Sequence, residues 1–76
     1  MWQNSKKITV LWTDNEDKNA QVWVEGLGWR RISILNDAQF LSMLAVCTAA
    51  YIANRFVTFF EFGVDGDIFI TEIYAA

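Results

Sequence analysis

The chain has 76 residues, of which 54% are hydrophobic and 16% aromatic, and its formal net charge is −3. This length allows a single domain, residues 1–76, with residues 1–6 expected to fray, and folding hides only about 60% of the surface of so short a chain. The apolar share exceeds the usual roughly 45–50%, so we expect some apolar side chains to lie at an interface. The negative charge disfavours nucleic acid as a partner, because phosphate binding needs a basic surface.

The first part of the chain predicts a β-hairpin. Residues 7–13 are β-branched and roughly alternating, and residues 14–19 are six consecutive polar residues of the kind that form turns. A second strand begins near residues 21–25 and resumes at residues 29–34. Residues 26–28 hold two glycines, which indicate either a bulge or an extra short strand.

A helix over residues 38–54 is the best-supported element. Asn36 and Asp37 are both favourable N-cap residues, and the run behind them is rich in Ala, Leu and Met. No charged residue lies between Asp37 and Arg55, so apolar surface runs nearly all the way round, as in a helix buried on both sides. The apolar run is too short for a bilayer, which needs about 20 residues, and we expect no membrane span.

Two aromatic-rich strands over residues 56–62 and 68–74 follow the helix. Asp65 and Gly66 between them favour a type I′ turn, in which both central residues need positive φ. The expected fold is therefore α+β in ββαββ order: two β-hairpins forming one antiparallel sheet, with one helix across a face. Both faces of this sheet are apolar, which is typical of a sheet covered on both sides.

Few residues in the chain are suited to catalysis. There is no histidine, the commonest acid–base group near neutral pH. Cys47 lies among apolar helix residues, and a single unpaired cysteine favours a soluble protein of the reducing cytoplasm. The acidic residues in 14–17 and 65–67 lack the spacing of a Ca²⁺ loop, and turn formation explains them. We expect no catalytic residue, no metal and no cofactor.

The candidate binding residues lie in or beside the glycine-containing stretch. Trp23 and Trp29 offer flat stacking surfaces, and Arg30 and Arg31 offer N–H donors for a carboxylate, a phosphate or sugar hydroxyl groups. A structural role is the alternative, in which the tryptophans pack and the arginines keep the surface hydrated.

The excess apolar surface also predicts a homo-oligomer, a dimer or larger. It lies on the helix and on the sheet face opposite the helix, and we expect another copy to cover at least one of them. The candidate interface residues are Phe40, Met43, Leu44, Cys47 and Phe59.

The composition supports three hypotheses about function. The first is a small non-enzymatic, self-associating module that presents its aromatic and arginine surface to a protein partner, because interfaces are enriched in these residue types. The alternative is an oligomeric small-ligand or carbohydrate-binding protein that uses the same surface. The third is an enzyme with a site between subunits, where Glu25, Glu61 or Glu72 beside Arg30 does acid–base work.

Overall fold

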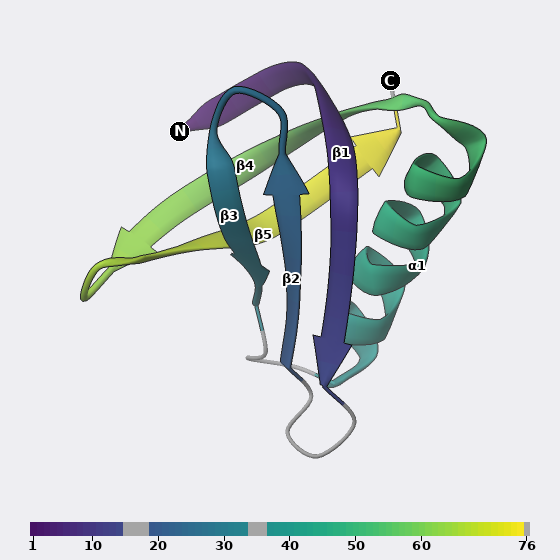
Figure 1. The fold of residues 1–76 in the computed structure, drawn as a ribbon. Coiled ribbons are helices and arrows are strands. Elements are labelled where there is room, and N and C mark those ends of the chain that lie inside the picture. Colours follow the sequence, from purple (N-terminus) through teal and green to yellow (C-terminus); the bar gives the residue numbers. More distant parts are fainter. Residues whose placement is uncertain (15–18, 34–36, 76) are drawn as a thin grey trace.

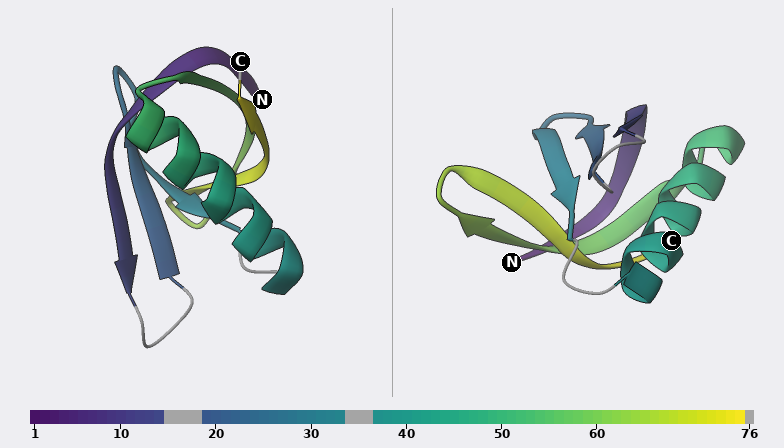
Figure 2. Two further views of the ribbon diagram at one scale, coloured as in Figure 1. Left: turned by 90° about the vertical axis from the view of Figure 1, so that its right-hand side faces the viewer. Right: turned by 90° about the horizontal axis from the view of Figure 1, so that it is seen from below.

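The computed structural model describes residues 1–14, 19–33 and 37–75. The elements follow one another as β1 (Trp2–Asp14), β2 (Asn19–Val24), β3 (Gly28–Ile32), α1 (Asp37–Ala53), β4 (Phe56–Val64) and β5 (Asp67–Ala75). The strands form a closed barrel in the order β1-β2-β3-β5-β4 (Figure 1). α1 packs mainly against β1 and β5 and lies along the side of the barrel between them (Figure 2).

The closed barrel shows that the expected open antiparallel sheet with a helix across one face is wrong. β3, which precedes α1 in the chain, pairs in parallel with β5, which follows it. In this pairing Arg31 lies opposite Phe69, and Ile32 lies opposite Ile70. The other side closes because β1 pairs with both β4 and β2. A sheet that closes on itself encloses its own inner face, so strands that are apolar on both sides need only one further covering layer.

β1 bends so that it belongs to both halves of the barrel. Its first half pairs with β4 and its second half with β2, and the register shifts once within each pairing. Ser5, which lies at the shift against β4, has a φ of 51°. Irregularities of this kind increase the bend and twist of a strand. The structure thus places residues 2–6, where we expected fraying, within β1.

The glycine-containing stretch separates two strands. Gly26 and Gly28 have φ values of 81° and 99°, and the Leu27 N–H donates a hydrogen bond of 2.9 Å to the Val24 carbonyl oxygen. β2 ends at Val24 and β3 begins at Gly28. Of the two possibilities for this stretch, the structure contains the extra short strand.

Two local predictions are confirmed. α1 begins at Asp37 and ends at Ala53, one residue from the expected bounds at each end. Asp65 and Gly66 have φ values of 50° and 85°, as a type I′ turn requires. Asn36, the other N-cap candidate, lies outside the described residues.

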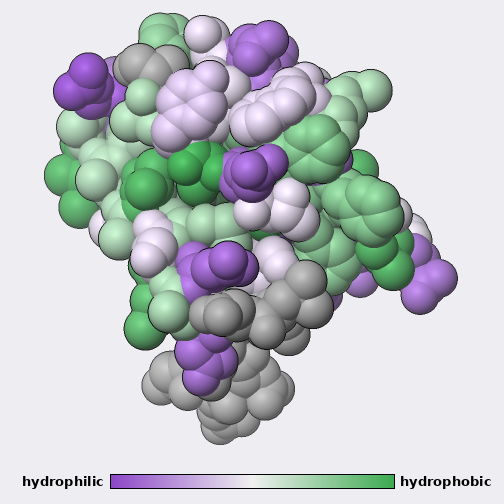
Figure 3. Space-filling view, turned by 180° about the vertical axis from the view of Figure 1, so that it is seen from behind, coloured by the Kyte–Doolittle hydropathy of each residue, from purple (hydrophilic) through white to green (hydrophobic). Residues whose placement is uncertain are grey.

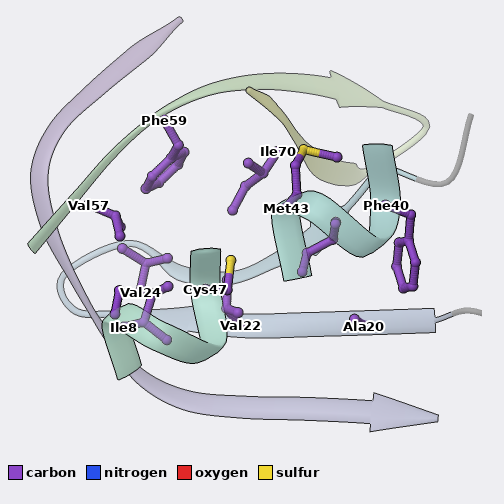
Figure 4. Packing of buried hydrophobic residues seen from close by; sticks show 12 residues of the cluster. Ile8, Ala20, Val22, Val24, Phe40, Met43, Cys47, Val57, Phe59 and Ile70 are labelled. Atoms are coloured by element: carbon purple, nitrogen blue, oxygen red, sulfur yellow. The ribbon is translucent and has the colours of Figure 1, made fainter. Parts of the chain in front are cut away.

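The core fills the barrel interior and the space beneath α1. Inward-facing strand residues meet one face of the helix there (Figure 4). The buried apolar residues are Ile8, Ala20, Val22, Val24, Ile32, Phe40, Met43, Cys47, Ala50, Val57, Phe59 and Ile70. Since α1 contributes only one face to this core, its opposite face lies on the molecular surface.

Candidate binding surface

The outer surface of β1, β2 and β3 carries several exposed apolar side chains on neighbouring strand positions. Those on β2 and β3 alternate with residues that face the core, such as Val22 and Val24. Each apolar member keeps 40–45% of its surface exposed. We call this group of side chains, together with the arginine at its edge, the tryptophan face; it consists of Val10, Trp12, Trp23, Trp29 and Arg31.

Strand pairing arranges the tryptophan face in two rows. In one row Val10 lies opposite Trp23, and Trp23 lies opposite Trp29. In the other row Trp12 lies opposite Gln21, and Gln21 lies opposite Arg31. The rings of Trp23 and Trp29 meet edge to face, with centroids 5.5 Å apart and planes at 86°, a favoured aromatic geometry. The two indole rings therefore contact each other on the outer surface of the barrel.

Arg31 places a positive charge beside the tryptophans. Its Nε lies 3.5 Å from Oδ1 of Asp67, and its Nη1 donates to Oδ1 of Asn19 at 3.5 Å. The Arg31 side chain is 38% exposed. Exposed ion pairs of this length contribute little to stability, so the guanidinium keeps most of its capacity to bind an acceptor group.

The four predicted binding residues divide between the two sides of the barrel wall. Trp23, Trp29 and Arg31 share the tryptophan face. Arg30 points inward and is 8% exposed. Its Nε donates to Oε2 of Glu61, and its Nη1 donates to two main-chain carbonyl oxygens at 3.0 and 3.2 Å. The structure thus separates Arg30 from the other three candidates and gives it a structural partner.

The sequence named Glu61 as one of three acids that could lie beside Arg30 between subunits, but it did not predict that the two side chains pair inside the barrel of one chain. Gln3 donates from Nε2 to the second carboxylate oxygen of Glu61, so both oxygens accept a hydrogen bond. Glu25 and Glu72, the other two acid–base candidates, are exposed. The alternation of Val57, Phe59 and Glu61 along β4 is a signal that could have placed the Glu61 side chain inside.

The predicted interface residues lie inside this chain or at the margin of its core. Leu44 is partly buried against the core, and the other four are buried: Phe40, Met43, Cys47 and Phe59. On the opposite face of α1, Leu41 is 62% and Ile52 is 77% exposed. Helical spacing from the buried stripe could have identified these two residues.

A second aromatic cluster lies on β1, β4 and β5, away from the tryptophan face. The Trp2 ring lies 5.4 Å from that of Phe60 and 6.3 Å from that of Tyr74. Seen from behind, apolar and weakly polar side chains cover much of the molecule and hydrophilic ones are scattered among them (Figure 3). Exposed apolar surface is therefore not confined to the tryptophan face.

The single thiol of the chain is buried. Cys47 is 0% exposed, and burial raises the pKa of its thiol to about 12. The thiolate is the nucleophilic form, and a high pKa keeps it scarce. Over residues 1–14, 19–33 and 37–75, no three or more Asp, Glu, Cys or His side chains gather in a way that could hold a metal ion.

Comparisons with known proteins give no family for the chain. A scan against protein-family models finds no match. A search of curated proteins finds no match either. Within the described part of the chain, no helix has the length and apolar character needed to cross a membrane.

Proposed function

We propose that this chain is a non-enzymatic binding module that acts as a homo-oligomer and holds a protein partner on the tryptophan face. The observation that carries the proposal is the placement of three tryptophans, each 40–45% exposed, on the outer side of adjoining strands. Interfaces are enriched in Trp and Arg, and a few such residues commonly supply most of the binding energy. Trp12, Trp23, Trp29 and Arg31 provide this combination on one surface.

A non-enzymatic role is supported by the chemistry of the acidic residues. Of the three glutamates considered for acid–base work, Glu61 accepts a hydrogen bond from Arg30, and that contact lies inside the barrel. Its two oxygens already accept hydrogen bonds from Arg30 and Gln3. A carboxylate committed in this way is poorly suited to exchange protons with a substrate.

Carbohydrate binding is a second candidate, favoured by the exposed Trp23–Trp29 pair beside Arg31. Indole faces stack on apolar sugar surfaces, and the guanidinium can donate to hydroxyl groups. A closed five-stranded barrel of this kind resembles the OB-fold, whose β2–β3 surface binds oligonucleotides or oligosaccharides. That argument is an analogy at the level of the fold. The net charge of −3 favours a sugar over a nucleic acid.

The experiment compares wild-type protein with Trp23→Ala and Trp29→Ala. Trp2→Ala is the matched control, since Trp2 is 47% exposed but belongs to the second aromatic cluster. Each variant is immobilised, exposed to an extract of the native cells, and its bound proteins are identified by mass spectrometry. We expect one specific protein that wild type and Trp2→Ala retain and the other two variants lose.

Other outcomes separate the candidates. Equal retention by all variants contradicts a role for the tryptophan face, and equal loss in Trp2→Ala indicates nonspecific apolar adhesion. A parallel glycan array tests the second candidate, which requires binding by wild type and loss of binding in Trp29→Ala. Circular dichroism of each variant establishes that it remains folded.

A further inference from the structure

The outer face of α1 is an apolar surface without charge. The helix has 17 residues, and after Asp37 in its first turn it contains no charged side chain. Leu41 and Ile52 on this face are 62% and 77% exposed. The helix of a monomer normally directs polar and charged residues to solvent. This face therefore has the composition of a contact surface.

The side chains on this face form a pattern that complements itself. Leu41, Ala45, Thr48 and Ile52 follow spacings of four, three and four residues, which place them on one side of a helix. The large residues stand at the two ends and the small ones at the centre. When two such helices run antiparallel, Leu41 of one meets Ile52 of the other, and Ala45 meets Thr48. Small central residues also let the helix axes approach to about 8 Å.

We infer that two copies of the chain associate through α1, as an antiparallel helix pair around a two-fold axis. This inference rests on the proposed self-association and assigns it a surface. A two-fold contact requires a patch that is complementary to itself, which the Leu41–Ile52 pattern provides. The helix macrodipoles also oppose each other favourably in an antiparallel pair.

The charges that border the stripe support a second copy in this orientation. Asp37 lies at the start of α1 and Arg55 lies two residues beyond its end, and both are exposed. Antiparallel pairing brings Asp37 of one copy near Arg55 of the other at both ends of the contact. Parallel pairing would place like charges together at each end. The ends of the two α1 helices are thus electrostatically complementary in the antiparallel orientation and not in the parallel one.

The surroundings of α1 supply the remaining contact area. A helix of 17 residues is about 25 Å long, which alone gives less than the roughly 800 Å² per partner of a stable interface. Tyr51 on α1 is 43% exposed, and Tyr74, which borders the end of α1, is 55% exposed. Two surface grooves of about 350 and 380 Å³ run between α1 and β5 and share Ile73. Side chains of a second copy can fill these grooves.

The first test measures mass in solution by sedimentation velocity over a series of protein concentrations. Wild type is expected to sediment as a dimer, and Leu41→Glu and Ile52→Glu as monomers, because each buries two uncompensated carboxylates at the contact. Phe62→Glu is the matched control, since Phe62 is 58% exposed on β4. It is expected to remain dimeric. Circular dichroism establishes that each variant is folded.

The second test determines the orientation of the helices. Asp37→Arg alone and Arg55→Asp alone each place like charges together, and we expect the dimer dissociation constant to rise on the order of tenfold. In an equimolar mixture of these two variants, the heterodimer has two restored pairs and should regain the wild-type constant. Failure of the mixture to recover overturns the antiparallel arrangement.

The outcomes distinguish the inference from the proposal on which it rests. A wild-type monomer at all concentrations contradicts both the proposed self-association and the helix contact. A wild-type dimer that survives Leu41→Glu and Ile52→Glu leaves self-association standing and overturns its assignment to α1. Loss of that dimer in Trp29→Glu would then identify the tryptophan face as the contact.

Discussion

Arg30 carries its charge into the barrel, where Glu61 compensates it. Only 8% of Arg30 and 9% of Glu61 is exposed, and Gln3 binds the remaining carboxylate oxygen. Loss of one member of a buried pair leaves the other charge without a partner in a medium of low dielectric constant. Replacement of both members by apolar residues avoids that cost. The neighbouring residue Arg31 is partly exposed to solvent, so one step along β3 separates a buried arginine from an exposed one.

Arg30→Leu is expected to lower the free energy of unfolding by about 3–5 kcal/mol, because Glu61 stays buried without its cation. The double variant Arg30→Leu/Glu61→Leu should recover most of the loss. Urea denaturation followed by tryptophan fluorescence measures both. Equal destabilisation in the single and double variants would contradict the role of Glu61 as the compensating charge.

Cys47 makes stability depend on pH at the alkaline end. Its folded pKa of about 12 lies above the unfolded value of 9.0, so the folded state holds the thiol proton more tightly. This contribution is fully present below pH 9 and is lost as pH rises from 9 toward 12, by about 1.4 kcal/mol per pH unit. Urea denaturation of wild type and Cys47→Ala at several alkaline pH values measures it. The stability difference between the two proteins should shrink above pH 9, and a constant difference would contradict the burial of the thiol.

At the scale of elements, the end of α1 is fixed by its backbone hydrogen bonds. Asn54 has a φ of 56°, and the Arg55 N–H donates to the Ala50 carbonyl oxygen at 2.9 Å. The Asn54 N–H donates to the Tyr51 carbonyl oxygen at 3.3 Å. Together these features form a Schellman motif, whose left-handed residue is usually Gly or Asn.

Asn54→Val should therefore lower the free energy of unfolding by about 1–2 kcal/mol, since a β-branched side chain is strained at positive φ. Asn54→Gly removes the same side chain without that strain, and we expect it to match or slightly exceed wild-type stability. Thermal unfolding followed by circular dichroism compares the two variants. If both destabilise equally, the side chain of Asn54 matters more than its backbone conformation.

Elements whose conformation is determined by residues close by in the sequence could be predicted from the sequence. The bounds of α1 follow from its composition and from Asp37, and the β4–β5 turn follows from Asp65 and Gly66. The chemistry of Trp23 and Trp29 predicts a binding role, and the structure places both on one exposed surface. The same chemistry predicts an exposed Arg30, but the direction of its side chain depends on Glu61, which lies 31 residues away. Chemistry alone named Glu61 among three possible acids beside Arg30, but it did not single out Glu61 or place the pair inside the barrel.

At the scale of the whole molecule, barrel closure depends on contacts between distant parts of the chain. Over the described residues, the parallel pairing of β3 with β5 consists of two residue pairs, and no periodic pattern in either strand predicts it. β1 bends at Ser5, and serine is not a residue type from which a positive φ would be predicted. Apolar residues on both sides of a strand are equally consistent with a sheet covered twice and with a barrel. The sequence pattern therefore could not distinguish the two.

A domain of this size is expected to have a stability of only about 4–11 kcal/mol, so the proposed association would contribute a sizeable share of it. If α1 joins two copies, unfolding separates them, and the midpoint of thermal unfolding must rise with protein concentration. Each tenfold increase in concentration should stabilise the dimer by about 1.4 kcal/mol.

Thermal scans of wild type over about a hundredfold range of concentration measure this dependence. The midpoint should rise in wild type and in Phe62→Glu, whose substitution lies outside the helix contact. It should be independent of concentration in Leu41→Glu, which is expected to unfold as a single chain. A wild-type midpoint that does not change with concentration would show that one copy folds alone, and that its exposed Leu41 and Ile52 gain no stability from a second copy.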